Sequence, residues 1–159
     1  MTDGDQTPMA EQSLGSLPSA GSYLGPAPVV HPETRQHWAA LGEGRLVLQQ
    51  CRTCGTVRFP LAPVCWVCLS AAHDWVPIPT RGTVAAAVTV HRATGDQRWA
   101  KEVPFVAGQV DMAGGYRIPG RILCDAARPP VRGTPVQAAA LSAKEGFGVL
   151  CFLLLEETS

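Results

Sequence analysis

The chain has 159 residues, of which 46% are hydrophobic and only 16% are charged, so it can bury a core but has little charge for a free-standing surface. Its formal net charge is zero. Five acidic residues lie in residues 1–30 or at the C-terminal end, which leaves a small positive excess between them. That excess suits small phosphorylated ligands better than a long track of DNA.

The amino-terminal residues carry no basic segment followed by an apolar one, so the sequence predicts no secretory signal. The longest apolar run, Val149–Leu155, is too short to span a bilayer, and we expect a cytoplasmic protein. Residues 1–30 are rich in Gly, Ser and Pro and lack an apolar period. They are predicted to be a disordered tail, with wrapping around a partner as the alternative.

A short helix is predicted within residues 31–44. Pro32 suits the first position of a helix, because that position needs no N–H donor. Trp38 and Leu41 lie three residues apart and share one face, and Gly42 and Gly44 end the pattern. We expect the helix to dock through Trp38.

The cysteine cluster in residues 45–78 is the strongest signal in the sequence. Cys51-x2-Cys54 and Cys65-x2-Cys68 offer four soft ligands in two pairs, which is the set that tetrahedral Zn²⁺ prefers. Because cysteine would fill all four positions, the one predicted Zn²⁺ is structural rather than catalytic. Redox pairs, two disulfides and a ligand role for His73 are the weaker alternatives.

Residues 79–157 alternate with the period of β-strands. After Gly82, one strand face is predicted to hold Val84, Ala86, Val88 and Val90, and the other Thr83, Thr89 and His91. Four more strands are predicted at residues 104–112, 116–125, 135–143 and 148–155, with Gly114-Gly115 as a hairpin turn. Five short strands favour an OB-type barrel over a sandwich, which needs about seven.

The last predicted strand is apolar on both faces. A barrel strand needs only one inward face, so its second face should be covered by the ribbon, the helix or another subunit. Cys124 and Cys151 fall on apolar strand faces and are interpreted as buried thiols, since no motif places a histidine beside either one. No catalytic residue is predicted.

Basic side chains cluster around one tryptophan and suggest contacts with the phosphates of CoA. Arginine forks suit phosphate oxygens, and an indole can stack on a purine. For each side chain, a solvated surface position is the alternative. The predicted CoA contacts are Arg58, Arg98, Trp99, Lys101, Arg117 and Arg121.

The order of these pieces resembles the zinc-ribbon/OB-fold acyl-CoA-associated family, long catalogued as domain of unknown function 35. The resemblance covers about residues 33–155. It rests on Trp38, Gly44-Arg45-Leu46, the two cysteine pairs with Gly55, Phe59-Pro60 and Pro63, then Gly82-Thr83-Val84, Pro104-Phe105-Val106-Ala107 and Gly133-x-Pro135-Val136. It implies a mainly β chain: a short N-terminal helix, a rubredoxin-like zinc ribbon and a C-terminal five-stranded OB-fold barrel.

The resemblance also implies a role as a non-catalytic subunit beside a thiolase-fold enzyme (thiolase, acyltransferase or lipid-transfer-type aldolase) or a hotdog-fold (MaoC-type) enoyl-CoA hydratase. Such subunits scaffold the partner and hold the CoA part of the substrate, and a bulky acyl-CoA such as a steroid side chain is the expected class. A nucleic-acid-binding zinc-ribbon/OB module is the alternative of a different class. It is disfavoured because the charge excess is small and the strands offer few stacking aromatics.

Overall fold

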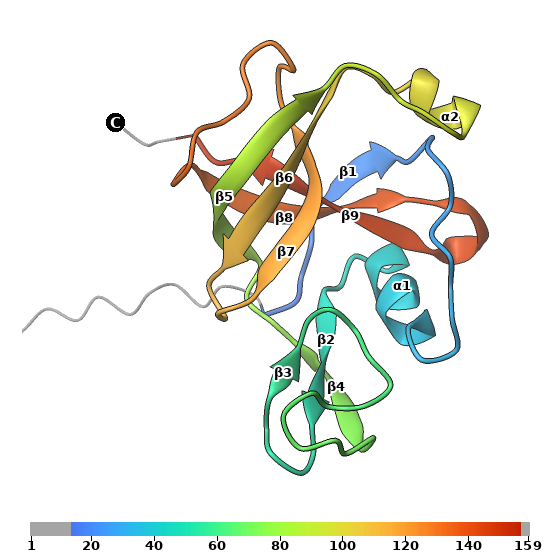
Figure 1. Ribbon diagram of the computed structural model, residues 1–159, viewed down its shortest axis with the longest axis vertical. Helices are drawn as coiled ribbons and strands as arrows, with labels where there is room; N and C mark the ends of the chain where they lie inside the picture. The colour runs from blue at the N-terminus through green and yellow to red at the C-terminus, as the bar shows by residue number, and fades with distance from the viewer. Residues whose placement is uncertain (1–13, 157–159) are drawn as a thin grey trace, which may run out of the picture.

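The computed structural model describes residues 14–156 as a three-stranded ribbon at one end and a β-barrel at the other, with a helix beside their junction (Figure 1). The elements in chain order are β1 (Ser19–Ser22), α1 (Arg35–Gly42), β2 (Val47–Cys51), β3 (Val57–Arg58), β4 (His73–Pro77), β5 (Arg81–Val90), α2 (Gln97–Ala100), β6 (Phe105–Met112), β7 (Arg117–Leu123), β8 (Pro135–Ser142), the 3-10 turn η1 (Lys144–Gly146) and β9 (Gly148–Leu154).

The five strands predicted after Gly82 form the closed barrel, which confirms the OB-type fold. Strands pair in the order β5-β6-β7-β9-β8, and β8 returns to β5 to close the ring. All pairs are antiparallel except β7 with β9. The turn between β6 and β7 uses Gly115 at φ +91°, a conformation that favours glycine, as the Gly114-Gly115 pair predicts.

The predicted faces of the first barrel strand are wrong because β5 contains a bulge. Val84 pairs with Val110, but Ala86 pairs with Gln109, so Ala85 is an extra residue. An extra residue reverses the alternation beyond it. Val84 is buried at 1% exposure, whereas Val88 is 61% exposed and Ala87 packs against the core instead.

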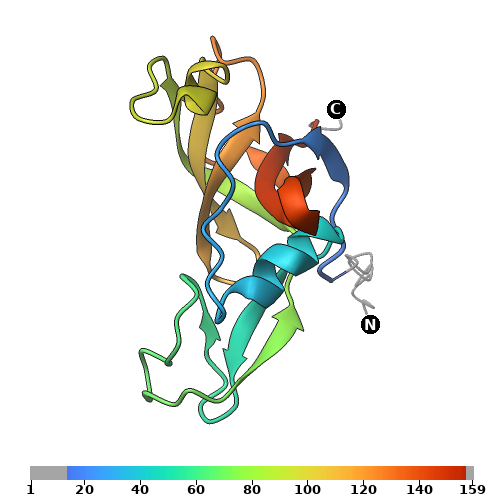
Figure 2. The ribbon, with the colours of Figure 1, turned by 90° about the vertical axis from the view of Figure 1, so that its right-hand side faces the viewer.

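The disordered tail predicted for residues 1–30 is corrected within the described part of the chain; residues 1–13 lie outside it. Strand β1 runs parallel to β8, with Ser19 opposite Ala140. Ahead of it, the Leu17 N–H donates to the Gly44 carbonyl, and the Leu17 side chain is buried. From β1 the chain runs down the side of the molecule to α1 (Figure 2). Local sequence patterns do not predict this strand, because it is held by pairing with β8, which lies far along the chain.

The doubly apolar last strand is covered by the same chain. Phe152 points into the barrel core, whereas Cys151 packs with Ala139 and Leu141 on the other face. Ala20 and Tyr23, from the segment predicted to be disordered, lie against that second cluster. The ordered amino-terminal segment and the doubly apolar strand β9 therefore have one explanation, because residues of that segment cover the outer face of β8 and β9.

Helix α1 packs on β8 and β9 and joins the ribbon to the barrel. Gly42 permits this contact, because a Cβ atom there would lie 1.9 Å from the Gly146 carbonyl oxygen. Leu46 and Ile78 at the base of the ribbon belong to the same buried cluster as the barrel residues. The apolar core is thus continuous across the two units. Within residues 14–156, no helix is long and apolar enough to cross a membrane.

Candidate metal centre and adjoining cavity

Two equivalent turns of the ribbon carry the four cysteines. In the first turn, the Gly55 N–H donates to the Cys51 carbonyl; in the second, the Leu69 N–H donates to the Cys65 carbonyl, at 2.9 and 2.8 Å. Gly55 and Leu69 both have positive φ, +77° and +63°. Each turn therefore curls its two thiols toward the same point. Glycine meets this requirement without strain in the first turn, while leucine does so at a cost in the second.

The sulfur positions fit one tetrahedral ion. Cys51 Sγ lies 3.5 Å from Cys68 Sγ, Cys54 Sγ lies 3.6 Å from Cys65 Sγ, and all four sulfurs fall within 4.8 Å of one another. A tetrahedron with Zn–S bonds of about 2.3 Å requires sulfur separations of about 3.8 Å. The donor set is all thiolate, so these residues would hold Zn²⁺ with no position left for water or substrate.

Hydrogen bonds in the first turn favour the thiolate form that a metal needs. The backbone N–H of Cys54 is the main cause that lowers the pKa of the Cys51 thiol to about 6, against the opposing effect of desolvation. A hydrogen bond with the Thr56 side chain is the main cause that lowers the pKa of Cys54. Both shifts reduce the number of protons that metal binding must displace from the first turn, whereas in the second turn the Ser70 N–H lowers the pKa of Cys68 but burial and the neighbouring thiols together raise it to about 11.

The interior of the ribbon includes two buried polar side chains, and one of them is a predicted CoA contact. Arg58 is fully buried, and its Nη1 donates to the Ala62 carbonyl at 3.0 Å. Gln49, also buried, accepts from the Ala62 N–H at 3.0 Å. Both side chains therefore hold the loop between the cysteine pairs. The prediction that Arg58 contacts CoA is corrected, because its guanidinium has no exposed surface.

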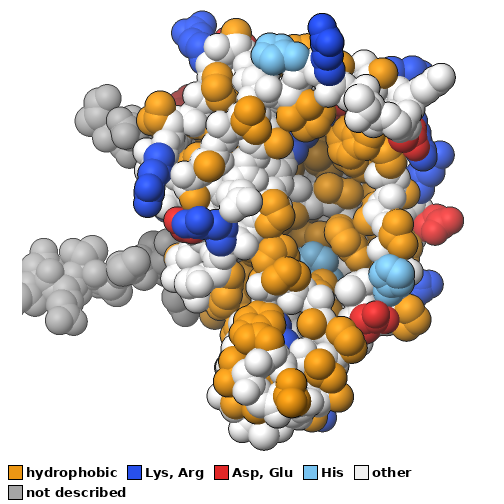
Figure 3. Space-filling model, viewed as in Figure 1, with side chains coloured by type: hydrophobic (Ala, Val, Ile, Leu, Met, Phe, Trp, Pro, Cys, Tyr) orange, Lys and Arg blue, Asp and Glu red, His pale blue; other side chains and the backbone are white. Residues whose placement is uncertain are grey.

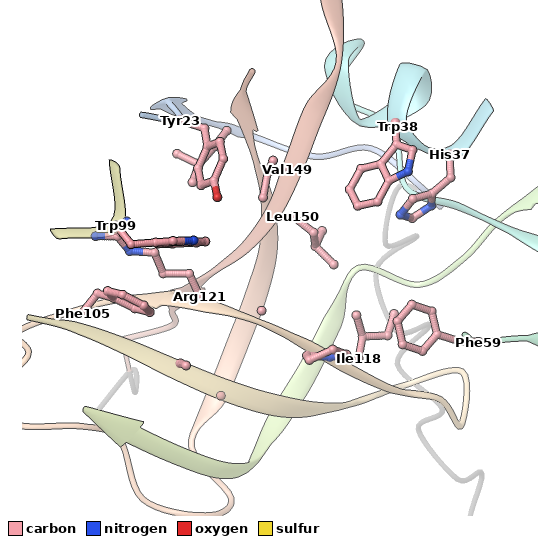
Figure 4. A pocket seen from close by; sticks show the side chains of 15 residues that line it. Tyr23, His37, Trp38, Phe59, Trp99, Phe105, Ile118, Arg121, Val149 and Leu150 are labelled. Atoms are coloured by element: carbon pink, nitrogen blue, oxygen red, sulfur yellow. The ribbon is translucent and has the colours of Figure 1, made fainter. Parts of the chain in front are cut away.

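A second feature lies beside the junction of ribbon and barrel: an apolar cavity of about 410 Å³. Figure 3 shows it as a hollow with hydrophobic walls. Trp38 and His37 of α1 stand at one end, and Trp99 of α2 and Arg121 of β7 at the other (Figure 4). Its walls come from elements far apart in the chain, so no local motif marks it.

Trp99 and Arg121, both predicted to contact CoA, are brought together in this cavity but are already engaged. Trp99 stacks on Phe105 with ring centroids 5.6 Å apart, and the Tyr23 ring lies edge-on to it at 6.1 Å. Arg121 forms an ion pair with Glu102 and lies over the Phe105 ring at 5.1 Å. Both side chains line the cavity, and a purine or a phosphate would have to compete with these contacts.

The other predicted CoA contacts lie on the surface and do not form one cluster. Arg98 is paired with Asp96 on the α2 loop, and Lys101 is exposed at the end of that helix. Arg117 pairs with Asp111 at 2.7 Å, at the opposite end of β7 from Arg121. Arg117 and Arg121 are predicted to share one strand face, but they pair with different carboxylates and do not form one phosphate site.

The two remaining cysteines have the environment of packing residues. Burial raises the pKa of Cys151 to about 11 and also raises that of Cys124. Their thiols donate to the carbonyls of Ala139 and Ile122, respectively. In the described part of the chain, no histidine hydrogen-bonds to either thiol. Both groups are therefore protonated at neutral pH and poorly suited to nucleophilic attack.

Two family models match the chain. The rubredoxin-like zinc ribbon domain of ChsH2 matches residues 38–74, and the C-terminal OB-fold domain of ChsH2 matches residues 75–141. The first contains all four cysteines, and the second begins within β4 and reaches into β8. The two matches meet within β4, the last strand of the ribbon.

Two known proteins are similar in sequence or structure. A solved structure titled Ltp2-ChsH2(DUF35) aldolase contains a chain that matches with a TM-score of 0.70 at 26% identity, over 80% of this chain and 98% of that one. A protein of Thermomonospora curvata named probable enoyl-CoA hydratase alpha subunit is 30% identical over 95 residues, which is 60% of this chain. This chain spans only 29% of the length of that relative.

Proposed function

The chain belongs to the zinc-ribbon/OB-fold family of domain of unknown function 35, and we propose that it is a non-catalytic accessory subunit of a complex that processes acyl-CoA. One observation carries this proposal: the chain matches 98% of a chain in a structure whose title joins Ltp2 and ChsH2(DUF35) as an aldolase. The match covers 98% of that chain and 80% of this one, so it extends beyond either the ribbon or the barrel alone.

The proposed partner is a thiolase-fold enzyme, with a lipid-transfer-type aldolase as the first candidate. The aldolase title supports this choice. A hotdog-fold enoyl-CoA hydratase is the second candidate, and the similarity to a probable hydratase alpha subunit favours it. In either case we propose that the partner supplies the catalytic groups. The closed thiolate site and the two protonated thiols of this chain support that assignment.

The second cysteine turn offers a surface on which such a partner can dock. Figure 3 shows hydrophobic side chains gathered at the ribbon end. We define the ribbon tip as four apolar residues of this turn, which are 43–75% exposed: Val64, Trp66, Val67 and Leu69. Exposed apolar residues that gather in one patch are typical of interaction sites. We assign the ribbon tip to the enzyme interface.

A contact between this chain and CoA is a further part of the proposal, confined to surface residues. Lys101 is the first candidate because it is exposed and makes no ion pair with any described residue. Arg98 and Arg117 are exposed but must exchange their carboxylate partners for a phosphate. We expect Lys101→Glu to weaken binding of CoA to the complex by calorimetry, and equal affinity would remove Lys101 from the site.

The nucleic-acid alternative loses support from the pairing of the basic side chains. Of the 13 Lys and Arg residues, six arginines form ion pairs with Asp or Glu in the described chain. The aromatic rings of Trp99 and Phe105 stack on each other rather than standing free. A single-strand binding groove needs unpaired basic groups and free stacking faces.

Co-expression with a candidate thiolase-fold or hydratase partner tests the proposal. We expect a stable complex through affinity purification and gel filtration, and an enzyme that loses most of its activity without this chain. If the chain purifies alone and the enzyme is fully active without it, the proposal is wrong.

A matched pair of surface variants tests the interface. Trp66→Arg places a charge in the ribbon tip and should prevent co-purification, whereas Val88→Arg places the same charge on an exposed barrel position and should not. Both variants should retain zinc. If Trp66→Arg binds the enzyme normally, the ribbon tip is not the docking surface.

A further inference from the structure

The cavity beside α1 has the dimensions of a small-molecule site. Its volume of about 410 Å³ lies within the range of known ligand pockets, roughly 300–1,000 Å³. The side chains of Trp38, Phe59 and Ile118 point toward it from α1, the ribbon and β7 (Figure 4). The walls therefore come from all three parts of the fold and are set in place by the continuous core.

The walls reject charged ligands. The Arg121 guanidinium is neutralised by Glu102, and its face is covered by Phe105. Tyr23 and Trp99 complete an aromatic wall around this ion pair. A phosphate or carboxylate entering here would lose hydration without gaining a free cation, which is unfavourable. A neutral apolar molecule is the class that these walls accept.

His37 supplies one polar atom of defined character. Its Nδ1 lies 2.9 Å from the Val47 carbonyl oxygen, which can only accept, so Nδ1 carries the proton. Burial lowers the pKa of His37, so the ring is neutral near pH 7. Nε2 is then an acceptor, and it forms no hydrogen bond within residues 14–156. A ligand hydroxyl can donate to Nε2, whereas an ether or a ketone cannot.

We propose that this cavity binds a neutral, apolar small molecule that carries one hydroxyl group, with the hydroxyl donating to His37 Nε2. The aliphatic or ring portion lies against Trp38, Ile118 and Val149 and reaches toward the aromatic wall at Trp99. This site is independent of the accessory-subunit proposal, because the free chain contains every residue that it needs.

Quenching of tryptophan by bromo-octanol, whose bromine quenches on contact, tests the site. The sample is the full, zinc-loaded chain with Trp66→Phe and Trp75→Phe, which leaves Trp38 and Trp99 as its two tryptophans, both in the cavity wall. We expect saturable quenching. The methyl ether of bromo-octanol has the same chain and bromine but no donor, and it should bind roughly threefold to tenfold more weakly.

Variants separate the cavity and its acceptor from non-specific adsorption. Ala107→Phe fills the hollow from β6 and should abolish saturable quenching, while Val88→Phe on the exposed face of β5 should not. Val149→Phe fills the same space from β9 if Ala107→Phe disturbs the circular dichroism spectrum. His37→Leu should make alcohol and ether bind equally, and His37→Gln should restore the preference through its amide oxygen.

Three results would overturn the proposal. These are no saturable quenching up to the solubility of bromo-octanol, quenching unchanged by both cavity-filling variants, and an ether that binds as tightly as the alcohol. Because no enzyme partner is present in the assay, none of these results bears on whether the chain joins an acyl-CoA complex.

Discussion

The zinc ribbon and the barrel, although they share one core, are stabilised by different means. Strand β3 of the ribbon has two residues, and the ribbon interior includes the buried polar side chains of Gln49 and Arg58. The barrel instead buries a large apolar set, which includes Val84, Val106 and Phe152. The comparison teaches that ligation organises the ribbon, whereas removal of apolar surface from water organises the barrel.

Removing one metal ligand should have the largest effect, and it should unfold the ribbon while the barrel stays folded. Cys51→Ser leaves an incomplete ligand set, and apparent zinc-binding energies in small ribbon-like modules are about 10–16 kcal/mol at neutral pH. We expect zinc content to fall from about one per chain to near zero. Amide exchange should become fast across β2, β3 and β4 and stay slow across β6 and β7.

The control for this variant is Cys124→Ser, which changes a thiol outside the metal set and should retain the zinc. If Cys51→Ser keeps both its zinc and its slow exchange in the ribbon, the ribbon does not depend on the metal. If the barrel amides become unprotected as well, the two units fold as one.

Phe152→Ala should destabilise the barrel without affecting the metal. The ring is fully buried in the barrel core, and truncation of such a side chain typically costs about 3–5 kcal/mol. Urea denaturation followed by circular dichroism measures the loss, and Val88→Ala at an exposed position should change stability by less than about 0.5 kcal/mol. Loss of zinc from folded Phe152→Ala would contradict the division of roles.

His37 should make the junction between the units sensitive to acid. Burial lowers its pKa in the folded chain below the ordinary 6.5, so the unfolded chain takes up the proton first as pH falls. The stabilising contribution is complete above about pH 6.5 and is lost below it, by at most about 1.4 kcal/mol per pH unit. Urea midpoints at pH 7.5 and 5.5 measure it.

The matched variant is His37→Asn, whose amide can still donate to the Val47 carbonyl but does not titrate. It should lose less stability between the two pH values than the natural chain does. Equal losses in the two proteins would mean that His37 does not cause the acid sensitivity.

The smallest expected effect comes from the strained residue of the second cysteine turn. Leu69 adopts φ +63° with its side chain 75% exposed, so Leu69→Gly should relieve strain and stabilise the ribbon by less than about 1 kcal/mol. Gly55→Leu, the reciprocal change at the equivalent position, should destabilise it. Guanidinium-induced zinc release measures both, and a Leu69→Gly chain that releases zinc earlier would contradict the prediction.

Local patterns in the sequence predict the cysteine turns and the five barrel strands, because both the spacing of the ligands and the period of the strands depend only on residues that are close in the sequence. The bulge at Ala85 escapes such patterns, since a bulge is defined only by the register of a partner strand. The burial of Arg58 could not be predicted for a related reason. It depends on contacts with the loop at Ala62, which Gln49 also holds, and the sequence around Arg58 does not indicate them.

The cavity is the part that could be predicted least. Trp99 and Arg121 attract attention as a basic and aromatic pair, but their contacts with Phe105 and Glu102 convert them into wall residues. The sequence gives no sign that His37 differs from other helix residues. Its role depends on the Val47 carbonyl, which accepts a hydrogen bond from Nδ1 and so fixes the tautomer of the ring. Side-chain chemistry here is decided by tertiary neighbours rather than by sequence order.

The parallel pairing of β1 with β8 has a consequence for the order of events during synthesis. Ser19 leaves the ribosome long before Ala140, so its position opposite Ala140 does not exist until β8 has been made. A contact between such distant residues is slow to close, so β1 should be among the last strands to reach its place. Until then, the outer face of β8 and β9 is available to whatever else is nearby.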